Sequence, residues 1–164
     1  MTQKISPEEI IQKFSLEKLL PEGGYFRQSY KSPQKIKSYG SESERSLATC
    51  IYYLLTEKNQ FHTVKSDEIF HFYNGAPAEL FLIDEQGNCS IQILSNQHLE
   101  GHLPQVLVPK NTYQAMRLLS SDPEAYAFMG TTVFPGFEYE DFKVYSTDEL
   151  LKKFPHLSKQ LANF

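Results

Sequence analysis

From Tyr25 to Phe134 the chain consists of short, largely apolar runs that end at turn-forming residues such as Asn74-Gly75. Runs of this length are typical of strands, in which successive side chains point to opposite sides of a sheet. Many short strands at regular spacing predict an all-β sandwich or a closed barrel. The expected strands are 25–30, 47–55, 62–64, 68–73, 78–84, 89–94, 105–109, 113–119 and 125–133.

Helical spacing of apolar residues is confined to the two ends of the chain. A capping box over Ser6–Glu9 precedes an apolar stripe, and a second one over Ser146–Glu149 opens a helix that Pro155 interrupts. The stretch 31–45 is polar and rich in Ser and Lys, and we expect a mobile connection there. The predicted layout is a helical segment within 1–20, a barrel over about 25–142 and a C-terminal helix over about 147–161.

Composition predicts one folded domain. The chain has 164 residues, of which 40% are hydrophobic and 13% aromatic, enough to bury a core without disulfide bridges. Cys50 and Cys89 make neither a disulfide framework nor a zinc site. No repeat, linker or low-complexity tract divides the sequence, so we expect a single domain over 1–164.

Charge and hydropathy exclude two classes of partner. The net charge is −4 and Lys and Arg are scattered, whereas nucleic-acid binders carry a concentrated basic face. The apolar runs are about strand length, shorter than the roughly 20 residues that cross a bilayer. The N-terminal residues include acids where an export signal needs an apolar stretch. We therefore expect no nucleic-acid or membrane partner and a cytoplasmic location.

The stretch most informative about chemistry runs from Phe61 to Gly75. By strand alternation Glu68, Phe70 and Phe72 share one face, and His71 lies on the other. A turn brings Glu68 toward His62, on the preceding strand, inside an apolar barrel. Such a pair suits metal binding or acid–base work. Burial raises the pKa of a Glu, and a nearby charged His lowers it again.

These residues resemble the first motif of the cupin superfamily: Gly, five residues, His-x-His, three or four residues, Glu, six residues, Gly. His62, Glu68 and Gly75 fall on its offsets, whereas Thr56 replaces the first Gly and Val64 the second His. The second motif resembles Pro109-Lys110-Asn111, with Gln114 in place of the third His. The resemblance implies a cupin-type double-stranded β-helix, a jelly-roll barrel, with short N- and C-terminal helices. It also implies a metal set reduced to His62, Glu68 and Gln114.

More narrowly, the chain is similar to a cupin-like family of unknown function, some of whose members are labelled predicted sugar epimerases. The resemblance implies a homodimer, which the edge strands of a small barrel also favour. The matching pieces cover most of the chain and are Pro21-Glu22-Gly23-Gly24-Tyr25-Phe26-Arg27, the stretch from Ser66 to Phe72, Pro104 to Pro109, Val133 to Phe137, and Asp141-Phe142.

A bound metal is not expected. Two strong ligands and an amide oxygen form a poor site for Zn²⁺ or Fe²⁺, which usually take at least three good donors. Val64 places methyl groups where a ligand would stand. If a divalent metal does bind, its ligands would be His62, Glu68 and Gln114. No cofactor is predicted.

The first functional hypothesis is a metal-independent isomerase or epimerase acting on a small carbonyl-bearing, sugar-like substrate. His62 would be the base, Glu68 would orient it, and Tyr25 or Tyr52 would donate the proton. Arg27 would hold an anionic group of the substrate. The expected substrate contacts also include Gln114, Phe70 and Phe72, together with His71 if a bulge turns it inward; otherwise His71 is structural or lies at a subunit contact.

Two alternatives remain open from the residues alone. One is a non-catalytic module that holds a small metabolite in the barrel, for which a co-purifying ligand and no turnover are expected. The other is a metal-dependent cupin oxygenase or isomerase with a degenerate site.

Overall fold

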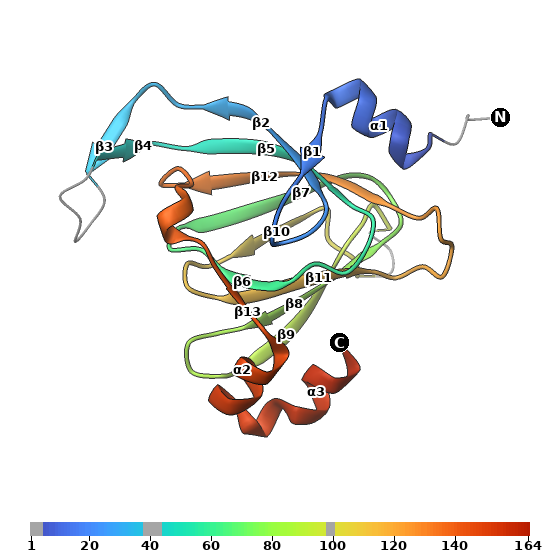
Figure 1. Cartoon of the computed structure of the whole chain (residues 1–164), viewed down its shortest axis with the longest axis vertical. Helices are drawn as coiled ribbons and strands as arrows, with labels where there is room; N and C mark the ends of the chain where they lie inside the picture. The colour runs from blue at the N-terminus through green and yellow to red at the C-terminus, as the bar shows by residue number, and fades with distance from the viewer. Residues whose placement is uncertain (1–4, 38–43, 98–100) are drawn as a thin grey trace.

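Two antiparallel sheets face each other in the computed structural model, which describes residues 5–37, 44–97 and 101–164 (Figure 1). The larger sheet has the spatial order β1 (Glu17–Lys18), β2 (Tyr25–Lys31), β5 (Thr49–Leu55), β12 (Ala127–Phe134), β7 (Asp67–Gly75), β10 (Gln105–Val108). The smaller sheet has the order β13 (Lys143–Tyr145), β6 (Phe61–Thr63), β11 (Tyr113–Leu118), β8 (Ala78–Ile83), β9 (Cys89–Leu94).

The core lies between the two sheets, because alternation turns every second side chain of a strand inward. β12 lies within the larger sheet and pairs with β5 and β7 over almost its whole length. Phe72, Leu80, Met116 and Met129 are among the buried side chains that meet there. Every residue of β8 is buried, which indicates that its outer face is covered as well.

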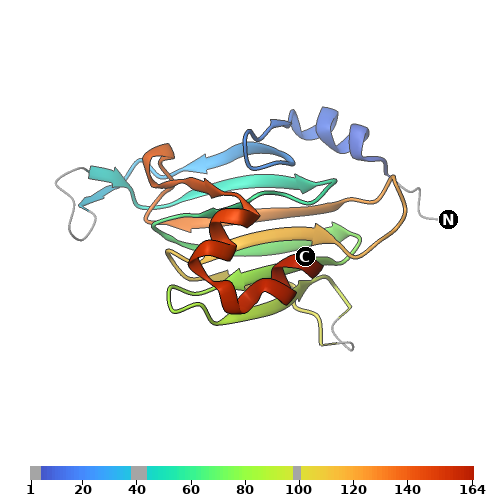
Figure 2. The same ribbon diagram turned by 60° about the horizontal axis from the view of Figure 1, so that its bottom comes forward.

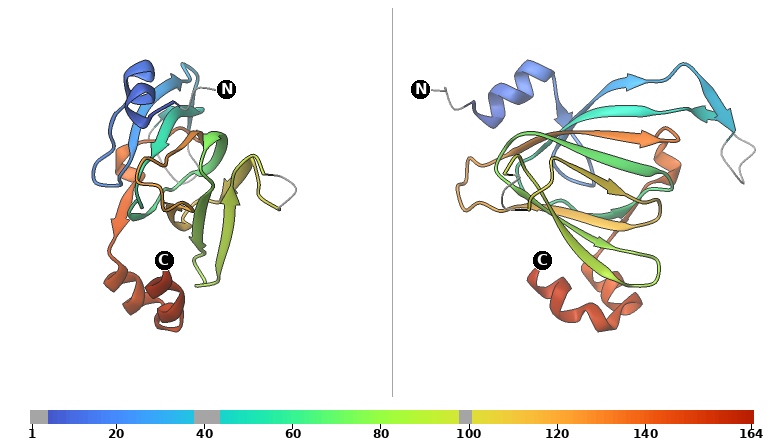
Figure 3. Two further views of the ribbon diagram at one scale, coloured as in Figure 1. Left: turned by 90° about the vertical axis from the view of Figure 1, so that its right-hand side faces the viewer. Right: turned by 180° about the vertical axis from the view of Figure 1, so that it is seen from behind.

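Short helices cover part of the outer face of each sheet. α1 (Pro7–Phe14) packs Ile10 against Leu54 and Phe128 on the outer face of the larger sheet. α2 (Thr147–Lys153), the 3₁₀ turn η3 (Pro155–Leu157) and α3 (Ser158–Asn163) pack against the smaller sheet around Phe81 and Tyr113 (Figure 2). The helices at the two chain ends therefore lie at opposite sides of the molecule (Figure 3).

The predicted fold is confirmed: a mainly β jelly-roll sandwich with short terminal helices. Both capping boxes are present, with each Ser side chain accepting a backbone N–H and each Glu closing back on the Ser backbone. Among the described residues, no helix is long and apolar enough to cross a membrane.

The stretch 31–45, expected to be a mobile connection, forms paired strands at its two described ends. β3 (Lys35–Lys37) and β4 (Glu44–Ser46) pair with each other and continue β2 and β5 outward as an arm (Figure 1). The polar composition hid this pair because Arg45 is buried by an ion pair with Asp141, far along the chain, and not by apolar neighbours. Residues 38–43 of the stretch lie outside the described residues.

The glycine of the predicted motif, Gly75, has a steric function. Its φ is +113°, and a Cβ there would lie 2.2 Å from the backbone oxygen of Tyr126. Gly101 also has a positive φ, +76°, but nothing lies within 4 Å of the position that a Cβ would take.

We expect Gly75→Ala to lower the free energy of unfolding by about 3 kcal/mol and Gly101→Ala by about 1 kcal/mol, because only the first adds a backbone clash to the strain. Urea unfolding of both variants tests this, and equal losses would contradict it.

Candidate functional site

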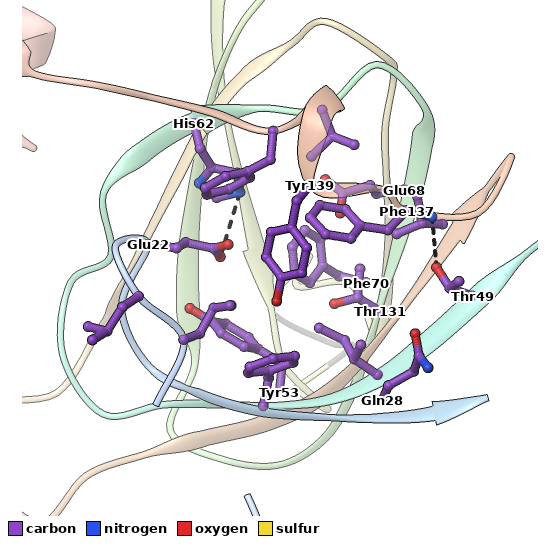
Figure 4. A pocket seen from close by; sticks show the side chains of 17 residues that line it. Glu22, Gln28, Thr49, Tyr53, His62, Glu68, Phe70, Thr131, Phe137 and Tyr139 are labelled. Atoms are coloured by element: carbon purple, nitrogen blue, oxygen red, sulfur yellow. Dashed lines mark hydrogen bonds and ion pairs between the residues drawn. The ribbon is translucent and has the colours of Figure 1, made fainter. Parts of the chain in front are cut away.

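A pocket opens between the sheets beside β5, β6 and β7, with a cavity volume of about 110 Å³ (Figure 4). That volume holds roughly four water molecules at liquid density, or a small organic molecule. Most of the lining is apolar, and the polar side chains form a minority within it. The lining residues are Leu19, Leu20, Glu22, Phe26, Gln28, Thr49, Ile51, Tyr53, His62, Val64, Glu68, Phe70, Thr131, Val133, Phe137, Tyr139 and Phe142.

His62 lies on β6, between β11 and β13, and is 3% exposed. Its Nδ1 is 2.8 Å from the backbone oxygen of Gln60. A carbonyl can only accept a hydrogen bond, so Nδ1 carries the proton and Nε2 keeps its lone pair. Burial lowers the pKa of His62, and the charge of Glu68 only partly opposes this. His62 therefore offers a neutral imidazole whose basic nitrogen is Nε2.

Glu22 is the carboxyl group that faces this nitrogen. Its Oε1 is 3.6 Å from His62 Nε2, and its side chain is 12% exposed (Figure 4). Burial raises the pKa of Glu22 to about 8, although a hydrogen bond from Asn59 lowers it somewhat. The turn that aims Glu22 inward needs Gly23 and Gly24, whose φ values are +110° and +77°. At neutral pH Glu22 is mostly a neutral acid beside a neutral base.

Glu68, on β7, is a second buried acid and is 6% exposed. Burial raises the pKa of Glu68 to about 7, against the lowering effects of His62 and of a hydrogen bond from Gln114. The amide nitrogen of Gln114, on β11, donates that bond across the barrel. Glu68 is thus half ionised near neutral pH, and its hydrogen-bond partner is Gln114.

Aromatic side chains from one segment cover the mouth of the pocket. Phe137 and Phe142 flank the 3₁₀ turn η2 (Tyr139–Asp141), and the ring of Phe142 lies 5.4 Å from the imidazole of His62. Tyr139 is 67% exposed, yet its ring and hydroxyl reach into the pocket (Figure 4). The backbone N–H of Phe137 donates to Thr49 Oγ1 at 3.0 Å.

Ion pairs hold this mouth segment in place. Arg45 and Asp141 form a buried pair, with side chains 7% and 3% exposed. The other carboxyl oxygen of Asp141 lies 3.7 Å from Lys65 Nζ, at the surface. Arg45 comes from the β3–β4 arm, so the arm and the pocket mouth are mechanically connected.

The structure brings only part of the predicted site together. His62, Glu68 and Phe70 line the pocket. Gln114 contacts Glu68 and is 1% exposed, but it does not line the cavity. The expected contact between Glu68 and His62 is not a hydrogen bond here: Gln60 orients His62, and Gln114 engages Glu68.

The predictions for Tyr25, Tyr52 and Arg27 place them on the wrong face of the sheet. Tyr25 and Tyr52 belong to the cluster under α1, and the guanidinium of Arg27 stacks 5.6 Å from the ring of Tyr52. Arg27 and Tyr52 are partners in the β2–β5 register, so their side chains share the outer face. The inward positions belong to their neighbours, among them Tyr53.

His71 and Phe72 also lie outside the pocket. His71 is on the outer face, where Nε2 is 3.0 Å from Thr132 Oγ1 and Nδ1 is 3.0 Å from Gln105 Nε2. This is the face that strand alternation predicted, and no bulge reverses it, because the irregularity between β12 and β7 falls beyond His71, at Phe128 and Met129. Phe72 faces inward but fills the core deeper in the barrel.

The donor set around His62 does not fit a metal ion. Val64 lines the pocket where a second His would stand, and Gln114 turns its amide nitrogen toward Glu68. No three His, Cys, Asp or Glu side chains within the described ranges group closely enough to hold an ion. Metals of this class usually need at least three such donors.

Sequence reasoning missed Glu22, Tyr53 and Tyr139. Glu22 lies in the Pro-Glu-Gly-Gly turn, where two adjacent glycines indicate a backbone conformation that other residues avoid. Tyr53 donates to the backbone oxygen of Gly23 at 3.1 Å, so it supports the same turn. Tyr139 follows the Phe-Pro-Gly-Phe stretch, and no local signal could have placed it over the pocket.

The raised pKa values of Glu22 and Glu68 predict how stability depends on pH. Above pH 4.5 the unfolded chain has already lost these protons, whereas the native protein keeps them until about pH 8 and about pH 7. Stability therefore falls as the pH rises through this window. His62 acts in the opposite direction, but only below its unfolded value of 6.5. We expect a loss of about 1–2 kcal/mol between pH 6.5 and 8.

A Glu22→Gln variant isolates this contribution, because it removes one titration and keeps the shape of the side chain. Urea unfolding at several pH values should give a slope less than half that of the wild type above pH 6.5. A wild-type stability that rises over this range, or a Glu22→Gln slope equal to it, would show that Glu22 is ionised in the native protein.

Comparison with known proteins agrees with the fold. A family described as "Cupin superfamily (DUF985)" matches residues 8–145. A solved protein from Shewanella oneidensis is 27% identical, with a TM-score of 0.84 over 97% of this chain and 96% of that one. A hypothetical protein from Leishmania major is 24% identical, with a TM-score of 0.84 over 93% and 94% of the two chains.

An enzyme shares the fold at lower similarity. Oxalate decarboxylase from Bacillus subtilis is 16% identical with a TM-score of 0.54, over 87% of this chain and 35% of that one. A search among curated proteins gives no match.

Proposed function

Because the chain belongs to the cupin superfamily, in the family described as DUF985, we propose that its pocket is the active site of a small-molecule isomerase or epimerase. The enzyme would move a proton at a carbon next to a substrate carbonyl and would need no metal. The fold itself hosts several chemistries, so the proposal is carried by the site.

The observation that carries it is the pairing of His62 Nε2 with Glu22, 3.6 Å apart and both largely buried. A general base works best when it is neutral at the working pH and held in one tautomer. The backbone of Gln60 holds the tautomer, and burial keeps the imidazole neutral. A protonated carboxyl group beside the base can protonate the carbonyl oxygen as the enolate charge develops, giving the enol.

The reaction is balanced by protons alone. His62 Nε2 would take the proton from the carbon while Glu22 protonates the carbonyl oxygen, which leaves an enol, an imidazolium and a Glu22 carboxylate. In isomerisation His62 returns its proton to the former carbonyl carbon, and Glu22 takes one from the hydroxyl of the carbon that lost its hydrogen. In epimerisation Glu22 takes back the enol proton while a proton is added to the opposite face of the same carbon, for which Tyr139 is the pocket hydroxyl closest to solvent; proton exchange with solvent then restores His62 and Tyr139. Tyr53 is less suited to donate, because its proton is already bonded to Gly23 and burial raises its pKa well above the usual value.

Hydrogen–deuterium exchange tests the proposal whichever product the reaction forms. A panel of small ketones and aldoses would be incubated with the protein and EDTA in D₂O, and loss of the α-proton signal followed by NMR. We expect stereoselective exchange for at least one compound. Saturable binding of panel members without exchange would contradict the enzymatic function and support the hypothesis of a non-catalytic binding module. Exchange that EDTA abolishes and a divalent metal restores would favour the metal-dependent alternative.

We also propose that the protein is a homodimer formed through the larger sheet. The outer face of that sheet exposes Tyr30, Tyr73 and Leu107, at 51%, 47% and 53%. These three side chains lie on β2, β7 and β10, so the exposed apolar surface extends across the sheet, and a second copy packed there would bury it. Light scattering at micromolar concentration should give twice the mass of 18.9 kDa, and the monomer mass would contradict this.

A further inference from the structure

We infer that the ligand of this pocket is an uncharged, unphosphorylated hydroxy-carbonyl compound with a compact apolar ring or branch. The inference names the substrate class and so rests on the proposed function. It depends on which charges surround the pocket and on how much of its wall is apolar.

The described wall of the pocket offers no positive charge to an anionic group. Among the described residues that line the cavity, none is Lys or Arg, and the acids Glu22 and Glu68 are both present. A phosphate or carboxylate entering this space would lose its hydration without a paired cation. It would also meet Glu68 partly ionised at neutral pH, since the pKa of that group is about 7.

Three cations contact the mouth segment, and each is paired with one of its acids. Arg45 contacts Asp141 and lies 3.4 Å from Glu140. Lys31 Nζ is 3.3 Å from Glu138, and Lys65 Nζ is 3.7 Å from Asp141. Each of these cations therefore has an acid of the mouth segment as its partner.

Arg27 could have held a diphosphate, but it lies on the outer face of the larger sheet and stacks over Tyr52. A nucleotide sugar is therefore a poor candidate, because its phosphates would meet no cation among the described lining residues.

The polar and apolar parts of the wall define the rest of the ligand. Glu22, His62 and Glu68 supply hydrogen-bonding groups for a carbonyl and a hydroxyl. Phe26, Ile51, Phe70 and Val133 are among the apolar residues that surround the remaining space. A wall of this kind favours a ring or branched carbon skeleton over an extended polyol.

A pair of probes tests the inference: 4-hydroxycyclohexanone, which is neutral, and 4-oxocyclohexane-1-carboxylate, in which a charged carboxylate replaces the hydroxyl on the same cyclohexanone ring. Binding would be followed by ¹⁵N–¹H NMR shifts at pH 7. We expect the neutral probe to bind at least about tenfold more tightly. A Gln28→Arg variant adds a cation at the pocket wall and should raise the affinity for the carboxylate by about tenfold.

Equal or tighter binding of the carboxylate to the wild type would overturn the inference. So would the absence of shifts with the neutral probe at about 10 mM, a range that ligands of this size reach. Binding is measured separately from exchange, so the two proposals can fail separately. If the neutral probe binds more tightly and no compound shows α-proton exchange, the result supports this ligand class and contradicts the proposed enzymatic function.

Discussion

Replacing His62 by Gln is expected to reduce α-proton exchange by about 10²–10⁴-fold, because the variant lacks the base that the proposed reaction needs. Gln is polar, is close in size to His, and can still donate to the backbone oxygen of Gln60, so the pocket should keep its shape. The rate constant for exchange of the best compound from the panel, measured by NMR under saturating conditions, is the quantity to compare.

Tyr52→Phe and Tyr53→Phe form a useful control pair for this experiment. Tyr52 is on the outer face under α1, so loss of its hydroxyl should leave exchange within about twofold of the wild type. Tyr53 supports the turn that carries Glu22, so loss of its hydroxyl should slow exchange without abolishing it. Full activity of His62→Gln with an unchanged fold by circular dichroism would rule out His62 as the base.

Replacing Arg45 by Met is expected to lower the free energy of unfolding by about 3–5 kcal/mol, because it leaves the buried carboxylate of Asp141 without its main partner. Lys65 lies 3.7 Å from the same carboxylate but is 67% exposed, so it can compensate for only a small part. Thermal unfolding by calorimetry and urea unfolding both measure the loss.

Two further variants identify the cause. Glu140, the outer partner of Arg45, is 69% exposed, and Glu140→Gln should change stability by less than about 0.5 kcal/mol. The double variant Arg45→Met, Asp141→Leu removes both charges and should recover most of the stability. If Arg45→Met costs no more than Glu140→Gln, the buried pair does not hold the mouth segment.

The sequence was sufficient for the architecture and for half of the site. The short strands predicted a sandwich or a closed barrel, because strand patterns are local and repeat along the chain, and the resemblance of His62, Glu68 and Gly75 to the cupin motif implied the jelly roll. The inward direction of Glu68 followed from strand alternation, since β7 carries apolar partners on that face at Phe70 and Phe72.

Alternation failed where both faces of a strand are apolar. On β5, Ile51 and Tyr53 face the pocket, whereas Tyr52 and Leu54 pack under α1. Sequence alone could not decide between these faces, because a helix from outside the barrel buries the second one. The prediction for Arg27 was wrong for the same reason, because Arg27 pairs with Tyr52 of β5 and its side chain shares the outer face.

The remaining residues of the site come from connections. Glu22 and Tyr139 lie on a turn and on a 3₁₀ segment whose course depends on distant partners, Asn59 and Arg45. Neither segment has a periodic pattern, so tertiary contacts determine where its side chains point. These two residues change the chemistry most, because they supply the acid beside His62 and the hydroxyl at the mouth.

All of the proposed chemistry depends on an unprotonated Nε2 on His62. Long-range ¹H–¹⁵N correlation spectra of the imidazole at neutral pH, in the presence of EDTA, measure this directly. The structure predicts a neutral ring with the proton on Nδ1, bonded to Gln60, and a free Nε2 facing Glu22. A ring protonated on Nε2 alone, or on both nitrogens at pH 7, would contradict the assignment of His62 as the base.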